Sequence, residues 1–193
     1  SQLQSYETES LTPEQKLSYD IYLADIQFKI QWLEYRKFEY PATYGFFGWP
    51  GATEIFFTQA FTFTNKDQAD IYVNLLNQVG RRFEQIGSLL ELRKSQGVIE
   101  PAITLRSSQQ AMAKMANTVA TSTSYYQAFD VQLAALSNIT ASDKSSLRAL
   151  LKATLEQSVL PAYKALSEQT LSLVSQAPNN IGFGQFIGGS EFY

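Results

Sequence analysis

The sequence contains neither cysteine nor histidine. Without cysteine there is no disulfide, no thiolate nucleophile and no cysteine-ligated zinc. Without histidine there is no Ser-His or Cys-His catalytic pair, and the usual ligands of a catalytic zinc ion are missing. We therefore expect no catalytic residue, no cofactor-binding residue and no metal ligand within these 193 residues.

Strong charge and long apolar runs are also missing. The 15 Lys and Arg residues and 18 Asp and Glu residues give a net charge of −3, without long runs of either sign. No basic stripe follows a phosphate backbone, so a nucleic-acid partner is not expected. No apolar run approaches the roughly 18 residues that a membrane span needs, so no span is expected either.

Helical patterns dominate what is present. With 45% hydrophobic residues the chain is long enough for one buried core, and we expect a single domain over residues 1–193. The first helix begins at Thr12, where Pro13 suits the first turn and Gln15 completes a capping box. Its apolar residues form two stripes, Leu17, Ile21, Ala24 and Phe28 on one face and Ile26, Ile30 and Leu33 on another. A helix apolar on more than one side is usually central, so we expect it in the middle of the fold.

Three more helical stretches follow. One runs without interruption from an Asn65 cap to a stop at Gly97, and another begins at Pro101 and is broken by residues 120–129. The last begins at a Thr140 cap and contains Pro161, which predicts a kink rather than an end. The predicted fold class is all-α, with long antiparallel helices in an irregular bundle, one long aromatic loop and a short extended C-terminal segment.

The aromatic loop spans residues 39–64, where prolines and glycines break any regular helix. One interpretation is a flap whose aromatic rings fill the groove between two helices. The other is the wall of a cleft that grips an extended or apolar ligand. Packing is favoured because large aromatic residues bury themselves more often than they bind.

Several other patterns have an ordinary structural explanation. Gly182, Gly184, Gly188 and Gly189 do not keep the spacing of a dinucleotide-binding loop, which favours a turn. The triplet Asn138-Ile139-Thr140 fits a glycosylation site, but its place before a helix favours a cap. The carboxylates Asp20, Asp25, Glu84 and Glu91 show no acid/base spacing and are interpreted as solvated helix surface.

Five segments, in this order, resemble a bacterial family catalogued as domain of unknown function 885: SLTPEQKLSYDIYLADIQ, ADIYVNLL, GVIEP, VLPAYKAL and IGGSEFY. The resemblance covers nearly the whole chain. VLPAYKAL followed by a Gly-Gly-x-x-Tyr segment is its most specific feature. Leu75 and Ala102 depart from it, because the family often carries basic residues there.

The resemblance implies a zinc metallopeptidase of the gluzincin kind. Family members carry an H-E-x-x-P-G-H-like helix after the Gly-Gly-x-x-Tyr segment, where two histidines hold zinc and the glutamate activates water. This chain stops before such a helix, so we expect it to be a non-catalytic helical N-terminal portion. Zinc and a catalytic half following Tyr193 are then expected in the full-length protein. The candidate residues of a substrate-cleft wall are Tyr44, Phe46, Phe47, Trp49, Glu191, Phe192 and Tyr193.

The implied partners are the catalytic half and a peptide or apolar ligand. Many family members carry export or lipoprotein signals, which implies the cell envelope or periplasm, with lipid anchoring of the full-length protein. The cytoplasm is the alternative. A rival interpretation of the whole chain is a stand-alone helical module of the envelope that binds a ligand or partner.

Overall fold

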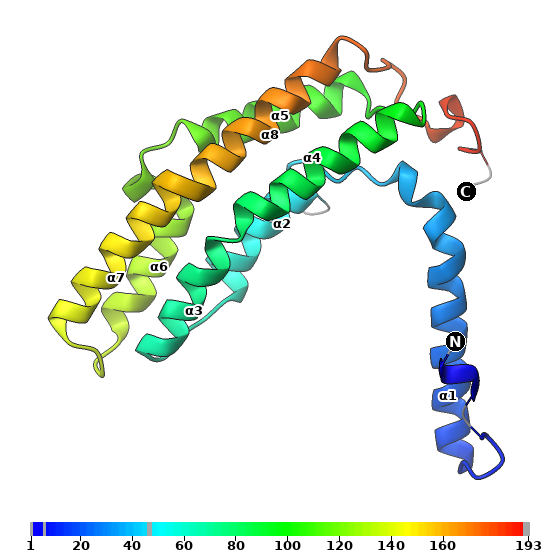
Figure 1. The fold of residues 1–193 in the computed structure, drawn as a ribbon, viewed down its shortest axis with the longest axis horizontal. Coiled ribbons are helices and arrows are strands. Elements are labelled where there is room, and N and C mark those ends of the chain that lie inside the picture. The colour runs from blue at the N-terminus through cyan, green and yellow to red at the C-terminus, as the bar shows by residue number, and fades with distance from the viewer. Residues whose placement is uncertain (1, 6, 46–47, 191–193) are drawn as a thin grey trace.

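Three long helical rods form a bundle in the computed structural model, which describes residues 2–5, 7–45 and 48–190; the second rod runs opposite to the other two (Figure 1). The first rod is α3 (Lys66–Leu76) followed by α4 (Val79–Ser95). The second returns as α5 (Ala102–Ala116) and α6 (Ser124–Ala135). The third runs from α7 (Ala141–Thr154) into α8 (Leu160–Val174) and packs against both other rods. The all-α fold class is confirmed.

A cluster of aromatic rings lies within the bundle core, whose other residues are mostly aliphatic. The fully buried Tyr72 of α3 lies at its centre, with the ring centroids of Phe57 and Phe129 each 5.0 Å away. Phe61 meets the same ring edge-to-face at 5.4 Å. Such edge-to-face pairs add about 1 kcal/mol each to the burial of their area. Phe57 and Phe61 come from the predicted aromatic loop, so part of that loop is core packing.

The aromatic loop is more helical than expected. Within residues 39–64 the structure has α2 (Trp49–Ile55) and a π-helical turn over Phe56–Ala60. Pro50 and Gly51, interpreted as helix breakers, lie in the first turn of α2. Proline suits a first helical turn because its missing N–H has no partner there in any case. The prediction of an irregular loop over the whole stretch was therefore wrong.

Each rod is interrupted near its middle. The helix predicted from Asn65 to Gly97 is divided at Asn77 and Gln78, which contradicts the expected single helix. Residues 124–129, predicted as a break, are the first half of α6, and the break is limited to residues 117–123 with a short 3-10 turn at Ala120–Ser122. Between α7 and α8 a π-helical turn (Leu155–Val159) precedes Pro161, so the helical rod continues through the proline, as predicted.

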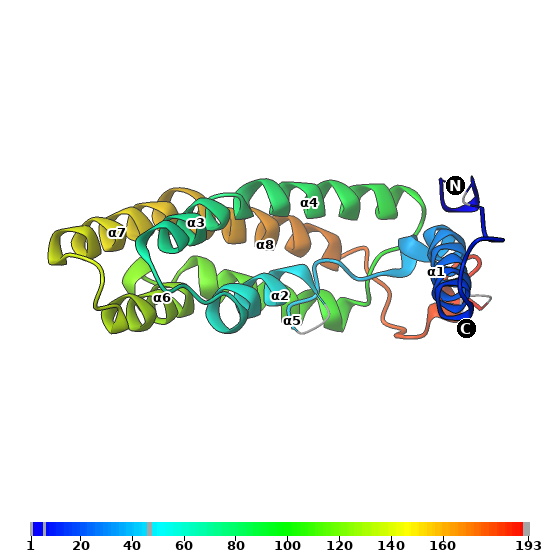
Figure 2. The same cartoon turned by 90° about the horizontal axis from the view of Figure 1, so that it is seen from below.

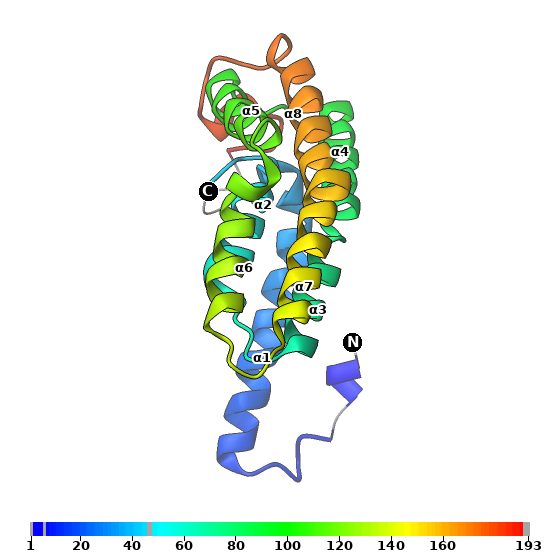
Figure 3. The ribbon, with the colours of Figure 1, turned by 90° about the vertical axis from the view of Figure 1, so that its left-hand side faces the viewer.

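Helix α1 (Pro13–Trp32) stands away from the bundle (Figures 1 and 3). A 3-10 turn (Leu33–Phe38) joins it to one end of the bundle, and Figure 2 shows it nearly end-on there. The predicted capping box is present, with Thr12 and Gln15 bonded in both directions. The predicted central position is wrong, because none of the residues of α1 is buried. A second short 3-10 turn (Gln2–Ser5) lies beside α1 (Figure 2).

The C-terminal segment folds back instead of extending. A 3-10 turn covers Phe183–Gln185, and Gly188 adopts a left-handed φ of 76°. Phe186 packs there with Phe38 and Val98 in a small second core at the foot of α1. Residues 191–193, part of the predicted extended segment, lie outside the described residues.

Candidate functional site

An apolar groove lies where α2 and its π-helical turn meet α3 and α4. Its volume is about 380 Å³, within the range of small-ligand pockets. We call it the aromatic groove. Its lining residues are Trp49, Ala52, Thr53, Phe56, Phe57, Leu75, Gln78, Val79 and Arg82.

Large side chains at the rim of the aromatic groove stay open to solvent. Trp49 is 47% exposed and Phe56 is 44% exposed. The Arg82 guanidinium carbon lies 3.9 Å from the centroid of the Trp49 ring, a cation–π contact that fixes the ring and keeps a positive charge at the rim. The groove therefore offers an apolar floor beside one fixed cation.

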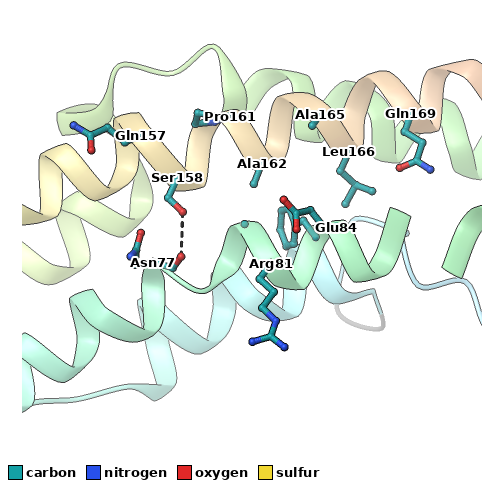
Figure 4. A pocket seen from close by; sticks show the side chains of 12 residues that line it. Asn77, Arg81, Glu84, Gln157, Ser158, Pro161, Ala162, Ala165, Leu166 and Gln169 are labelled. Atoms are coloured by element: carbon teal, nitrogen blue, oxygen red, sulfur yellow. Dashed lines mark hydrogen bonds between the residues drawn. The ribbon is translucent and has the colours of Figure 1, made fainter. Parts of the chain in front are cut away.

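A second hollow, the α4–α8 cleft, lies on the other side of α4 and has a volume of about 540 Å³ (Figure 4). Ala162 and Leu166 point from α8 toward α4, whereas Arg81 points away from α8. At one end Ser158 donates to the Asn77 carbonyl at 3.1 Å, which ties the break in the first rod to the π-helical turn of the third. The cleft lining also includes Gly80, Phe83, Glu84, Gln157, Pro161, Ala165 and Gln169.

The α4–α8 cleft is closed at its other end by Gln169. Its amide donates to the Gly87 carbonyl at 2.9 Å and to Glu91 at 3.2 Å, so the polar groups at that end are already paired within the bundle. The cleft mixes polar and apolar groups without a nucleophile–base pair, and its contacts are those of helix packing. The aromatic groove is consequently the better candidate for a binding site.

Tyr44 belongs to a polar cluster behind the aromatic groove. Its hydroxyl donates to Glu54, whose other oxygen accepts from Ser124 at 2.6 Å. Burial, helped by the hydrogen bond to Glu54, holds the pKa of the Tyr44 hydroxyl well above its ordinary value. Nearby, the buried hydroxyls of Tyr125 and Tyr163 bond each other at 2.7 Å. The cluster stays protonated on its tyrosines at neutral pH and connects α2, α6 and α8.

A buried ion pair lies near the C-terminal end of α1, where the following turn joins the bundle. Arg93 Nη1 and Glu100 Oε1 are 3.4 Å apart, and both side chains are about 2% exposed or less. Arg93 Nε donates to the Lys37 carbonyl at 2.6 Å, and Thr43 donates to Glu100 at 3.3 Å. Burial raises the pKa of Glu100 to about 7, against the opposing attraction of Arg93. This pair joins the end of α4 to the turn that carries α1.

The structure describes two of the seven predicted cleft-wall residues. Trp49 lies on the rim of the aromatic groove, and Tyr44 lies half-buried in the cluster behind it. Phe46, Phe47, Glu191, Phe192 and Tyr193 lie outside the described residues. Sequence reasoning missed Arg82 and Leu75, because only the fold brings the first rod alongside α2. A cleft-wall role for all of these residues stays a prediction.

No three Asp or Glu side chains gather into a metal-ligating group in the part of the chain that the structure describes. Within the same ranges, no helix is long and apolar enough to cross a bilayer.

Comparison with solved structures gives the same fold in a larger protein. The chain superposes on "the crystal structure of the putative lipoprotein from Colwellia psychrerythraea" with a TM-score of 0.73 and 20% sequence identity. The match covers 76% of this chain and 25% of that one, so about three quarters of this chain corresponds to a quarter of the larger protein. A search of curated proteins found no match. The family described as "Bacterial protein of unknown function (DUF885)" matches residues 1–193, and the chain therefore belongs to that family.

Proposed function

We propose that the chain is the non-catalytic helical N-terminal portion of a longer bacterial zinc metallopeptidase, and that it forms one wall of the substrate cleft. The aromatic groove is the observation that carries the cleft-wall part. Its apolar floor suits an apolar peptide side chain, and Arg82 beside Trp49 suits a peptide carbonyl or carboxylate. The zinc and peptidase part rests on the sequence resemblance.

In this proposal the reacting groups belong to polypeptide that follows Tyr193, including the histidines and the glutamate of an H-E-x-x-P-G-H-like helix. The bundle contributes position: its rods hold the aromatic groove rigid, so that a bound peptide is presented to the metal-bearing half. The cell envelope is the proposed location, supported by the description of the structural neighbour as a lipoprotein. The cytoplasm is the alternative.

The test is Trp49→Ala in the full-length protein. Removing the ring deletes apolar contact and frees Arg82, so the KM for a peptide with an apolar side chain should rise about tenfold, equivalent to about 1.4 kcal/mol. Zinc content and kcat should change little, because no reacting group is touched. Val131→Ala, at a 71% exposed position on α6, is the matched control. An unchanged KM in Trp49→Ala would exclude the cleft-wall role, and a wild-type protein without peptidase activity would exclude the enzyme.

A second candidate function is a self-sufficient module that binds an apolar ligand in the aromatic groove. The groove volume of about 380 Å³ favours it, since a ligand of that size needs no second half. The probe is the dye anilinonaphthalene sulfonate, titrated into the 193-residue chain. One saturable site that is lost in Leu75→Glu would support the module. Binding that does not saturate, or that survives Leu75→Glu, would oppose it.

A further inference from the structure

The exposed surface of α1 is unusually apolar for a helix that touches so little. Leu17 and Ile21 are each 62% exposed, and Phe28 and Ile30 are 60% and 57% exposed. None of the residues Pro13–Trp32 is buried. Single exposed apolar residues are ordinary on protein surfaces, but several of them on one helix mark an interaction surface.

The apolar residues of α1 lie on two opposite faces. Leu17, Ile21 and Phe28 share one face, because their spacings of four and seven residues follow the helical repeat. Ile21 and Ile30 are separated by about two and a half turns at 3.6 residues per turn, so Ile30 lies on the opposite face. The ion pair between Asp25 and Lys29, at 2.6 Å, occupies one edge between the faces. A flat partner or a second copy across a two-fold axis covers one face only, whereas both faces need covering.

The described chain ends beside the foot of α1. Lys37, at the end of the turn that follows α1, donates to the Ile187 carbonyl at 3.5 Å. Phe186 packs on Phe38 at the same place, with ring centroids 6.1 Å apart. Figure 1 shows this C-terminal segment next to the end of α1 that joins the bundle. The segment around residues 186 and 187 therefore lies against the end of α1 that joins the bundle, and chain that continues from this segment would start near the exposed faces.

The structural neighbour gives a measure of how much further chain a protein of this fold can hold. The structural neighbour is about four times as long as the matched region, since the match covers 25% of it. Enclosing a 20-residue helix of roughly 30 Å requires several packed elements, which a few residues cannot supply.

We propose that α1 is the central helix of a second structural unit of the full-length protein, enclosed on both apolar faces by polypeptide that follows residue 193. The bundle is then one unit, and α1 is its contribution to the core of the other. This inference rests on the proposed function only in requiring additional chain after residue 193. It requires neither zinc nor peptidase activity.

The first experiment compares amide hydrogen exchange in the full-length protein and in the 193-residue chain. Amides of α1 should exchange at least about a hundredfold more slowly in the full-length protein, because opening α1 there means unfolding a core. Amides of α8 should exchange equally in both and serve as the internal control. Equal exchange of α1 in the two proteins would overturn the proposal. Protection of α1 in the short chain that grows with protein concentration would also overturn it, because a second copy would then be the partner.

The second experiment tests the two faces separately. Ile21→Asp and Ile30→Asp should each lower the Tm of the full-length protein by several degrees. In each variant an unpaired carboxylate would lie in the core of the second unit, where its burial is unfavourable. Neither should move the main unfolding transition of the 193-residue chain, where both positions are exposed. Val131→Asp, at an exposed position on α6, is the control and should leave both proteins unchanged. A full-length protein that tolerates either α1 variant would contradict enclosure on both faces.

These results are separable from the proposed function. A full-length protein without zinc or peptidase activity would end that proposal, yet the protection of α1 and the effects of the two variants would still be measured. Conversely, a full-length protein that is an active zinc peptidase but whose α1 amides are unprotected would support the proposed function and overturn this inference.

Discussion

Glu100 is a buried carboxyl whose pKa is raised from its ordinary value into the neutral range. It is 2% exposed, paired with Arg93, and bonded by Thr43 on the segment that leads from α1 into α2. A buried pair of this kind contributes little net stability compared with an apolar pair, but breaking it leaves an uncompensated buried charge. Its value to the fold is geometric, since it sets how the turn after α1 leaves the bundle.

The raised pKa of Glu100 predicts a pH dependence of stability. Folded Glu100 keeps its proton up to about pH 7, whereas the unfolded chain releases it near the usual 4.5. Because the folded state binds the proton more tightly, the free energy of unfolding should fall as pH rises through this window, by up to about 3 kcal/mol. Urea unfolding at several pH values measures this. Glu100→Gln should remove that part of the pH dependence, and a variant with the wild-type pH profile would show that Glu100 is not the group responsible.

A side chain at position 51 should clash with the backbone at the start of α2. A Cβ at this position would lie 2.4 Å from the Gly45 carbonyl oxygen, which is backbone and cannot rotate away. Gly51→Ala should therefore destabilise the chain by about 2 kcal/mol or more. Gly80→Ala is the matched control, because its Cβ would make ordinary contacts, with Ser158 Oγ at 3.4 Å and the Ser158 carbonyl oxygen at 4.0 Å. The control should be neutral or stabilising by up to about 1 kcal/mol, since alanine favours a helix. Equal losses in the two variants would contradict this explanation.

At the scale of elements, the helix starts were predictable and the interruptions were not. Thr12, Asn65 and Thr140 each accept a backbone N–H as predicted, because a cap is a local interaction that the local sequence specifies. The division at Asn77 has no breaker residue. Its carbonyl is bonded by Ser158 from the third rod, a partner 81 residues away that local sequence does not show.

The residues of the candidate site also divide into those that the local sequence indicates and those that depend on distant contacts. Trp49 was predicted as a residue of a cleft wall; it lines the aromatic groove, and its role there stays a prediction. Arg82 was missed because its contact with Trp49 depends on how the first rod packs against α2. The apolar pattern on two sides of α1 predicted a central position, which was wrong because none of its residues is buried against the described bundle.

Helix α1 should also behave as an independent element in the 193-residue chain. Thr12→Ala removes the capping box and should cost about 1 kcal/mol of local helix stability. Because α1 packs so little, this should increase amide exchange within Pro13–Trp32 and leave the bundle Tm unchanged. Exchange and thermal unfolding followed by circular dichroism measure the two effects. A bundle Tm lowered together with α1 would mean that the two unfold as one unit.

At the scale of the whole molecule, the chain divides into a self-contained bundle and an exposed helix. The continuous core runs through all three rods, from Phe57 and Tyr72 to Tyr163 and Leu173. That core supports a stable scaffold. The aromatic groove and the two apolar faces of α1 are surfaces that stay open, and they correspond to the two proposed roles, a cleft wall and a docking element.

The most direct test of the central claim is the zinc content of two proteins after dialysis, the full-length protein and the 193-residue chain. The account predicts about one zinc ion per full-length molecule, together with peptide cleavage that a chelator abolishes, and neither property in the short chain. A full-length protein that carries no zinc, or a short chain that binds zinc stoichiometrically, would contradict the account.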